Sequence, residues 1–274
     1  MDTDATVALG GINMVVSILI WLITLVTSYH FIVRTWWFPE SASAHGHLLD
    51  GQFETTLIVT GIVFILAQVA LGYLVWKYRQ KPSSKKAIYT HGSHRLEMAS
   101  IVVTTIVFYL MVIPGQSIWA DLYINEPAQD SIQIEVTGQQ FAWNIRYPGP
   151  DGKFGRIRPD LIDDSSGNPL GLDFEDPAAE DDLVLPTIAL PVNRPIELLL
   201  RSKDVTHSFF VRELRIKQDN VPGLTIPLRF TPTQTGTFEV ACAELCGLGH
   251  HRMRSFVEVL SDADYRAWLK EMAE

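Results

Sequence analysis

The sequence predicts a membrane-anchored α+β protein with three N-terminal transmembrane helices, a small all-β domain and a C-terminal helix. Residues 1–120 contain three long uncharged segments. From residue 130 onward the apolar residues alternate in short runs between turn residues, which is typical of antiparallel strands. The two parts of the chain also differ in charge. Residues 1–120 contain 6 acidic and 7 basic residues, whereas residues 121–274 contain 25 acidic and 15 basic residues. We therefore expect a transmembrane anchor over residues 1–120 and an external domain over residues 121–274.

The three uncharged segments are each long enough to cross a bilayer. They hold 29, 22 and 23 residues and cover 5–33, 55–76 and 98–120. A helix needs roughly 20 residues to cross about 30 Å of hydrocarbon. We therefore expect helices at about 7–33, 55–77 and 98–119. The first segment lacks a basic leader and a clean small-residue cleavage site, so we interpret it as a retained helix rather than a signal peptide.

The loop between the second and third segments sets the expected orientation. It contains six basic residues and no acidic one before Glu97: Lys77, Arg79, Lys81, Lys85, Lys86 and Arg95. Such a loop favours the cytoplasmic side of a membrane. We therefore expect a multi-pass protein of the bacterial inner membrane, with residues 121–274 in the periplasm or on the outer face. The acidity of that domain argues against nucleic acid as a partner and favours a basic protein.

The loop over residues 34–54 falls on the outer side in this arrangement. Its aromatic residues Trp36, Trp37 and Phe38 suit a membrane interface. His45 and His47 in the same loop raise the possibility of a metal site, but solvated loop histidines are favoured.

Alternating apolar residues in the external domain predict short strands around residues 132–136, 141–147, 196–200, 238–242 and 256–260. The phase of the alternation shifts between the first two runs, and a bulge or bend at Gly138 accounts for that shift. The Pro222-Gly223 pair predicts a turn. Ser261 and Asp264 form a capping pattern ahead of apolar residues at helical spacing, which predicts a terminal helix packed on the β-domain.

Residues 148–186 interrupt the strand pattern, because they are rich in Pro, Gly, Asp and Glu and poor in apolar residues. We interpret this segment as an acidic surface insertion. Calcium binding is an alternative, but the acidic residues lack the spacing of an EF-hand, so a solvated loop is favoured. The acidic residues concerned are Asp163, Asp164, Asp173, Glu175, Asp176, Asp181 and Asp182.

The two cysteines of the chain lie in one short segment with other metal-ligating residues. Cys242 and Cys246 are followed by His250 and Met253. A lone cysteine pair on the oxidising side of a membrane usually forms a disulfide. Thiolate, imidazole and thioether groups together instead favour copper, and two thiolates can bridge a pair of copper ions.

A further histidine ligand is expected from another part of the domain. The external domain contains only His207, His250 and His251. His207 follows the alternating run around residues 198–200, as expected for a ligand donated from a neighbouring loop. We expect a structural or surface role for His251, because it is adjacent to His250.

The pattern Cys-x-Glu-x-Cys-x3-His-x2-Met over residues 242–253, with Asp-Val-x-His-Ser over residues 204–208, resembles subunit II of the haem-copper cytochrome c oxidases. The resemblance covers about residues 50–260. It implies a cupredoxin-like Greek-key β-barrel with a binuclear copper centre, CuA. The implied function is to accept electrons from a c-type cytochrome and pass them to the haem of subunit I, for the proton-coupled reduction of oxygen to water. The implied partners include the other oxidase subunits and the lipid membrane.

The resemblance also implies a role for each residue of the copper segment. Cys242 and Cys246 bridge the two copper ions in this assignment. His207 and Met253 complete one ion, and His250 with the backbone carbonyl of Glu244 completes the other. The Glu244 side chain resembles the carboxylate that binds a magnesium or manganese ion at the contact with subunit I.

Two further segments resemble functional parts of the family. Glu97 stands at a position like that of a glutamate near the mouth of a proton channel in subunit I, and an ordinary helix-start carboxylate is the alternative. Residues 138–143 resemble the aromatic segment through which electrons enter, but Phe141 stands where the family usually has tryptophan. Phe141 or Trp143 is therefore expected to receive the electron, and a core aromatic is the alternative for each.

The segment at 5–33 is additional to the family's usual two-helix anchor, so we expect it to contact another subunit or another respiratory complex. No Cys-x-x-Cys-His motif is present, so we expect no haem on this chain and a separate electron donor. A membrane-anchored copper chaperone is the main alternative function. In such a chaperone the histidine lies far downstream of the Cys-x3-Cys pair, whereas His250 here is four residues after Cys246. Among other copper electron carriers, nitrous oxide reductase needs a large propeller domain. A quinol oxidase subunit of the same fold lacks the copper ligands.

Overall fold

The computed structural model describes residues 3–35, 37–79, 81, 89, 91–126 and 128–272. Two compact units are present, one formed by Met1–Phe38 with Asp50–Gly115 and the other by Pro39–Leu49 with Gln116–Glu274. Three residues used in the sequence analysis lie outside the described part of the chain: Trp36, Lys85 and Lys86.

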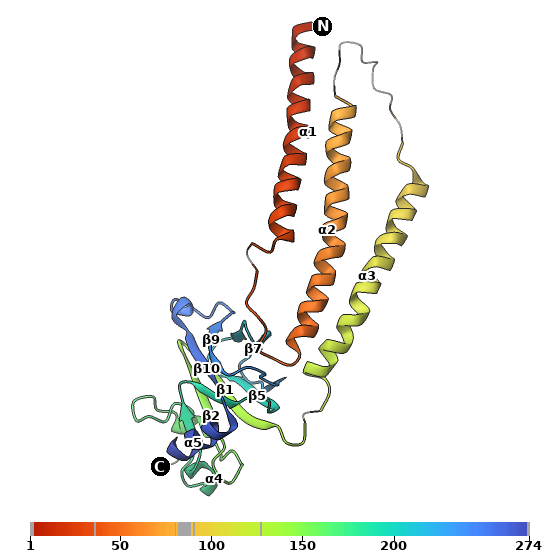
Figure 1. Cartoon of the computed structure of the whole chain (residues 1–274). Helices are drawn as coiled ribbons and strands as arrows, with labels where there is room; N and C mark the ends of the chain where they lie inside the picture. Colours follow the sequence, from red (N-terminus) through yellow and green to blue (C-terminus); the bar gives the residue numbers. More distant parts are fainter. Residues whose placement is uncertain are drawn as a thin grey trace. The chain divides into compact units, whose positions relative to one another are not determined.

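Three long helices dominate the first unit (Figure 1). They are α1 Thr3–Ile32, α2 Gly46–Lys77 and α3 His94–Tyr123. Within the described residues, each contains a segment that is long and apolar enough to cross a membrane, as the sequence predicts. α2 begins at Gly46 rather than near residue 55, because hydropathy marks only the part of a helix that crosses lipid. Residues 46–54, which include Asp50 and Glu54, interrupt the uncharged pattern without ending the helix.

α1 packs on α2 through a tryptophan that lies over a glycine. Trp21 Nε1 donates a hydrogen bond to the carbonyl of Val69 at 3.3 Å, and a Cβ at Gly72 would overlap the Trp21 indole. Beyond the end of α1, Arg34 Nη2 pairs with Glu54 Oε1 at 2.6 Å. A small residue lets two helices approach closely in a membrane, where apolar burial alone does not drive association. The first segment is therefore a helix docked on α2.

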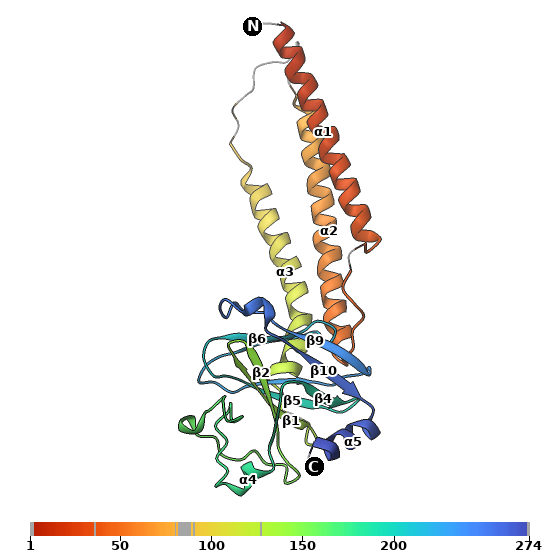
Figure 2. The ribbon, with the colours of Figure 1, turned by 90° about the vertical axis from the view of Figure 1, so that its left-hand side faces the viewer.

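In the described part of the second unit, two five-stranded sheets pack face to face (Figure 2). Their strand orders are β3-β2-β1-β5-β8 and β4-β10-β9-β6-β7. β1 pairs with β5 in parallel and β10 pairs with β4 in parallel, while the other pairs are antiparallel. The strands are β1 Ile132–Gln139, β2 Ala142–Tyr147, β3 Leu183–Leu185, β4 Ile188–Pro191, β5 Ile196–Ser202, β6 His207–Val211, β7 Ile216–Asn220, β8 Ile226–Phe230, β9 Gly236–Cys242 and β10 Arg254–Leu260.

The core of the domain lies between these sheets and comes mainly from the alternating residues of the predicted strands. Its members include Ile134, Val136, Trp143, Ile145, Leu198, Leu200, Phe209, Val240 and Val257. The terminal helix α5, Asp262–Met272, packs on the same domain, where the Trp268 ring lies 5.2 Å from that of Tyr147. Its start is capped as expected, because the backbone N–H of Asp264 donates to Ser261 Oγ at 3.2 Å. The Pro222-Gly223 turn is also present, with Gly223 at φ +80°.

The structure corrects the prediction of a bulge or bend at Gly138. Pairing between β1 and β2 is continuous, since Gly138 lies opposite Trp143 and Gln139 lies opposite Ala142. The phase shift arises from a tight turn at Gln140 and Phe141, and alternation alone does not distinguish such a turn from a bulge. Phe141 therefore lies in the turn with 38% of its surface exposed, whereas Trp143 is 3% exposed in the core. The two aromatic residues do not share one face of a strand.

The insertion over residues 148–186 covers the outer face of the sheet that contains β1 and β2. It includes the short helices η1 Pro159–Leu161 and α4 Pro177–Glu180 as well as β3. Beneath it, Arg146 is 1% exposed and its Nη1 pairs with Glu135 Oε2 at 3.0 Å. The Nε of Arg146 donates to Asp182 Oδ2, also at 3.0 Å. The insertion thus supplies one carboxylate of a buried ion cluster.

The expectation of a solvated acidic loop is therefore wrong for two of its residues. Asp182 pairs with the buried Arg146, and Asp173, which is 1% exposed, pairs with Arg156 at 2.7 Å. Composition counts acidic residues but does not show which of them face an arginine. Asp163, with its side chain turned to Ser165, remains exposed as expected.

Residues 39–45, from the loop before α2, also belong to the β-domain. Ala42 is buried, its N–H donates to the carbonyl of Glu213 at 2.7 Å, and its carbonyl accepts from Thr233 at 2.8 Å. Ser43 Oγ donates to the carbonyl of Leu214 at 2.7 Å. This segment, which we call the strap, adds backbone pairing that the sequence analysis did not predict.

The strap also changes the interpretation of the two loop histidines. His45 is partly buried beside Ser43, and this burial lowers its pKa. His47 lies in the first turn of α2 and is exposed. The prediction of a solvated histidine is therefore wrong for His45, because a hydropathy pattern does not reveal docking of the strap. Neither histidine lies in a cluster of potential metal ligands among the described residues.

We expect an external domain of residues 116–274 to be less stable than a version that carries residues 39–45 on a flexible linker. Several hydrogen bonds of about 1 kcal/mol net each are lost with the strap. The conformational entropy lost when the strap is ordered offsets part of the stabilisation by these hydrogen bonds. The expected difference in the free energy of unfolding is therefore about 2 kcal/mol. Urea unfolding measures the difference, and Ala42→Asp in the linked version is the control that should remove the gain. Equal unfolding midpoints with and without the strap would contradict this assignment.

Candidate metal centre

Pairing of two strands brings the distant histidine to the cysteine segment. His207 is the first residue of β6 and Cys242 is the last residue of β9. These strands pair antiparallel, with Phe209 opposite Cys242. Cys246 lies in the loop that follows β9, and the short helix η2 His250–Arg252 then leads to Met253 ahead of β10. We call residues 243–253 the ligand loop.

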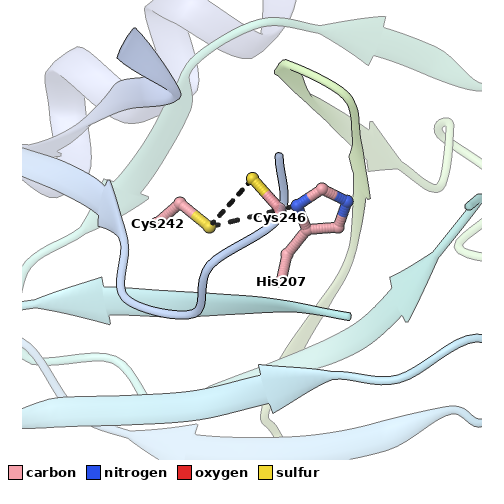
Figure 3. Close-up of side chains that lie close together, drawn as sticks. All are labelled: His207, Cys242 and Cys246. Carbon is pink, nitrogen blue, oxygen red and sulfur yellow. Dashed lines mark hydrogen bonds between the residues drawn. The ribbon is translucent and has the colours of Figure 1, made fainter. Parts of the chain in front are cut away.

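The predicted ligand groups converge on the two sulfur atoms, and Figure 3 shows three of the residues concerned, His207, Cys242 and Cys246. Cys242 Sγ lies 3.8 Å from Cys246 Sγ and 3.9 Å from His207 Nδ1. Cys246 Sγ lies 3.6 Å from His250 Nδ1 and 3.8 Å from Met253 Sδ. A disulfide needs a sulfur separation of about 2.05 Å. The cysteines are therefore free thiols beside two imidazoles and a thioether, rather than the disulfide expected of a lone pair.

A backbone carbonyl completes the set of donors. Cys242 Sγ lies 3.2 Å from the carbonyl oxygen of Glu244, and Glu244 itself is an exposed residue. His207, Cys242 and Cys246 offer ligand atoms within 4.8 Å of one another and are all buried. Two thiolates, two imidazoles and a thioether in one dry site suit copper better than magnesium or calcium, which prefer oxygen ligands. The donor set therefore fits a copper centre.

The thiols of this site carry an electrostatic cost that a cation offsets. Burial raises the pKa of Cys246 to about 11, and the adjacent Cys242 adds to the increase. Two neighbouring thiolates without a cation are therefore disfavoured at neutral pH. A bound metal replaces the thiol protons and stabilises both thiolates, so the pair is suited to ligation rather than to free thiolate chemistry.

Gly138 makes room for the His207 ring. A Cβ at Gly138 would lie 2.8 Å from His207 Cδ2 and 3.0 Å from Cγ. Real side chains do not approach so closely, so any larger residue would displace the imidazole. The glycine that the sequence analysis assigned to a bulge is required here by a close approach instead.

Asp204 fixes the orientation of His207. His207 Nε2 lies 2.8 Å from Asp204 Oδ1. Burial alone would raise the pKa of Asp204, but hydrogen bonds from His207 and from the backbone of Gln140 and Val205 outweigh it and lower the pKa. The carboxylate is therefore ionised and accepts the Nε2 proton, which leaves Nδ1 to face Cys242. Asp204 is the first residue of the Asp-Val-x-His-Ser pattern, and its position three residues before His207 is the sequence signal for this contact.

The two aromatic candidates for receiving the electron differ in position. The ring of Phe141 lies against the ligand loop, since a Cβ at Gly247 would lie 3.2 Å from Phe141 Cζ. The ring of Trp143 lies behind the site, with its centroid 6.1 Å from that of His207 and 5.6 Å from that of Phe209. Phe141 is thus exposed and touches the ligand loop, whereas Trp143 is enclosed by the core.

The remaining predicted residues lie apart from the cluster. His251 is exposed, as expected. Among the described residues, no further histidine, cysteine or carboxylate gathers with the Glu244 side chain, so a cation there would need ligands from another chain. Glu97 lies in the first turn of α3, where it is exposed and 3.9 Å from His94 Nδ1. Its role at a proton channel stays a prediction.

Comparison with known proteins gives consistent matches. Residues 132–260 match the family described as cytochrome C oxidase subunit II, periplasmic domain. The chain is 36% identical over 260 residues to the alternative cytochrome c oxidase subunit 2 of Bradyrhizobium diazoefficiens, which covers 94% of this chain and 92% of that protein. It is 29% identical over 233 residues to the cytochrome c oxidase subunit 2 of Cereibacter sphaeroides, covering 82% and 75%. A crystal structure of the periplasmic domain of subunit II from Bradyrhizobium japonicum aligns with 26% identity and a TM-score of 0.40, over 54% of this chain and 96% of that chain.

Proposed function

The chain belongs to the cytochrome c oxidase subunit II family, and from that premise we propose that it accepts electrons from a c-type cytochrome at a binuclear copper centre. It then passes them to the haem of subunit I of a bacterial cytochrome c oxidase, for proton-coupled oxygen reduction. The observation that carries this proposal is the convergence of His207, Cys242, Cys246 and Met253 in one buried cluster.

Contacts of the two sulfurs support a bridging role for both cysteines. The proposed ligands of one copper ion are His207 and Met253, and those of the other are His250 and the Glu244 carbonyl. Cys242 Sγ contacts His207 and the Glu244 carbonyl. Cys246 Sγ contacts His250 and Met253. Each sulfur therefore lies beside one member of each proposed ligand set, so Cys242 and Cys246 would both hold the copper pair if it were bound.

Burial of these groups suits electron transfer. When bound, the copper pair supplies a site that takes up and releases one electron shared between the two ions. His207, Cys246 and Met253 are 0%, 3% and 2% exposed, and His207 is held by Asp204. Ligands fixed in a closely packed interior move little when the charge changes, which keeps the reorganisation cost of each transfer small.

Phe141 is the residue that we propose to receive the electron, because it is exposed and touches the ligand loop. We expect Phe141→Ala to slow reduction of the copper centre by the cytochrome without changing the copper spectrum, since removal of the ring lengthens the tunnelling gap. Stopped-flow kinetics on the intact oxidase measure this rate.

Trp143→Ala is the comparison variant, because Trp143 lies behind His207 in the core. It should lower stability by about 3–5 kcal/mol, as expected for an aromatic core truncation, and should perturb the copper spectrum. A Phe141→Ala oxidase with full copper content and an unchanged reduction rate would reject Phe141 as the accepting residue.

We expect reduction by a basic c-type cytochrome to slow as the salt concentration rises. Residues 121–274 carry 25 acidic and 15 basic residues, so the domain can steer a cationic partner, and salt screens that attraction. Stopped-flow rates at increasing ionic strength measure the effect. A rate that is constant across this series would point to an apolar or permanently bound donor.

Three further roles complete the proposal. The exposed Glu244 side chain contributes to a magnesium or manganese site at the contact with subunit I, and Glu97 lies near the mouth of a proton channel in that subunit. α1 contacts another oxidase subunit or a neighbouring respiratory complex. The basic residues after α2 support a location of the β-domain in the periplasm or on the outer face of the inner membrane.

Copper content tests this function against the chaperone alternative. We expect two copper ions bound through this chain in the purified oxidase, in addition to the copper of the oxygen-reducing subunit. A copper chaperone would release its metal to an acceptor protein, and its copper would not be reduced by a c-type cytochrome. Absence of copper on this chain, or a single ion, would overturn the proposal.

A further inference from the structure

Gln140 contacts both segments that carry the ligands. Its backbone N–H donates to Asp204 Oδ2 at 2.7 Å, and the other oxygen of that carboxylate holds His207. Its side-chain Nε2 donates to the carbonyl of Cys246 at 2.6 Å. One residue of the β1–β2 turn is therefore linked to the His207 side of the site through Asp204 and to the Cys246 side directly.

The bond to Cys246 acts on a part of the backbone with unusual freedom. Gly247, which follows Cys246, has a φ of +132°, a conformation that other residues rarely adopt. Glycine has many accessible backbone conformations, so the peptide after Cys246 is poorly fixed by local preference. The Gln140 side chain lies across this glycine, where a Cβ would be 2.8 Å from Nε2. The hydrogen bond selects one orientation of the Cys246 peptide and thereby of its thiol.

We propose that Gln140 is a positioning residue of the copper centre, which holds Cys246 through its side-chain amide. This inference rests on the proposed function. Its side-chain hydrogen bond ends on the carbonyl of Cys246, so Gln140 acts on the thiol through the backbone. Its neighbour Phe141 packs on the same loop, so the turn that we propose to receive the electron is also the turn that fixes one bridging sulfur.

The neighbouring Gln139 provides a matched control. Its side chain accepts a hydrogen bond from Lys203 Nζ at 2.9 Å rather than contacting the ligand loop. Gln140→Met removes the amide donor, keeps a side chain of similar length and leaves the backbone N–H that binds Asp204. Gln139→Met makes the same chemical change one residue away. Comparison of the two variants separates loss of the Cys246 bond from a general effect of replacing glutamine in this turn.

The experiment uses the intact oxidase with each variant, and it measures copper release to a chelator, the electron paramagnetic resonance spectrum and the reduction potential of the centre. We expect Gln140→Met to release copper about fivefold faster, the factor for one net hydrogen bond. It should also make the sharing of the unpaired electron unequal and shift the potential. Gln139→Met should match the wild type in all three measurements.

Gln140→Met with wild-type copper release, spectrum and potential would overturn the inference, as would equal changes in both variants. Thermal unfolding of each oxidase shows that the domain is folded. A wild-type oxidase without a copper pair on this chain would instead reject the proposed function, so the two failures are distinguishable.

Discussion

Replacing Cys242 with serine is expected to abolish the binuclear copper centre and, with it, oxidation of the c-type cytochrome by the complex. No other cysteine besides Cys246 exists in the chain, so nothing can replace the lost thiolate bridge. Loss of an outer-shell partner of a metal ligand typically costs roughly 10- to 100-fold in metal affinity or activity. Loss of a bridging ligand should cost more than that. Copper content and steady-state cytochrome oxidation measure the effect.

Thr237→Ser is a matched control for this variant. Thr237 lies on β9, the same strand as Cys242, but its side chain is exposed at the other end of the strand. It should retain wild-type copper content and turnover. A Cys242→Ser oxidase that kept a copper pair and normal turnover would show that Cys242 is not a bridging ligand.

Replacing Arg146 with methionine is expected to destabilise the β-domain by about 3–5 kcal/mol, the cost of leaving a buried charge without its partner. Arg146 is 1% exposed between Glu135 and Asp182. Glu135 retains a contact with Arg201 at 3.3 Å, but Asp182 would lose its arginine in a site that excludes water. Urea unfolding of the purified chain, followed by tryptophan fluorescence, measures the change.

Arg158→Met is the control, because it removes an arginine that belongs to the insertion itself. Arg158 pairs with the exposed Asp160 at 2.6 Å, and exposed ion pairs contribute little to stability. Arg158 also lies 3.9 Å from the buried Asp173, but that carboxylate keeps its closer partner, Arg156 at 2.7 Å, when Arg158 is replaced. We expect its unfolding midpoint to equal that of the wild type. Equal midpoints for Arg146→Met and Arg158→Met would contradict the importance of the buried cluster.

The ligands of the copper segment were predictable because their chemistry and spacing lie within one short stretch of sequence. Cys242, Cys246, His250 and Met253 belong to a single loop, and the external domain offers few histidines to complete the site. β1, β2, β5, β9 and β10 were predictable for the same kind of reason, since alternation of apolar residues is a local pattern. The other five strands in the described part of the domain were not predicted.

The supporting contacts were not predictable, because they join segments that are far apart in the sequence. Gln140 contacts Cys246 because β1 and β2 pair and the ligand loop lies against their turn. Ala42 of the strap meets Glu213 in the same way, and Asp182 meets Arg146 across the insertion. Composition and periodicity carry no information on these long-range contacts. The long-range contacts nevertheless decide which carboxylates are buried and which aromatic residue faces the surface.

Electron paramagnetic resonance of the oxidised, purified oxidase tests the proposed copper centre most directly. We predict a seven-line hyperfine pattern, because one unpaired electron shared equally by two copper nuclei couples to both of them. Cys242→Ser should eliminate this pattern while leaving the haem signals of the complex in place. A four-line pattern from a single copper ion, or no copper signal from this chain, would contradict the assignment of a binuclear centre to His207, Cys242, Cys246, His250 and Met253.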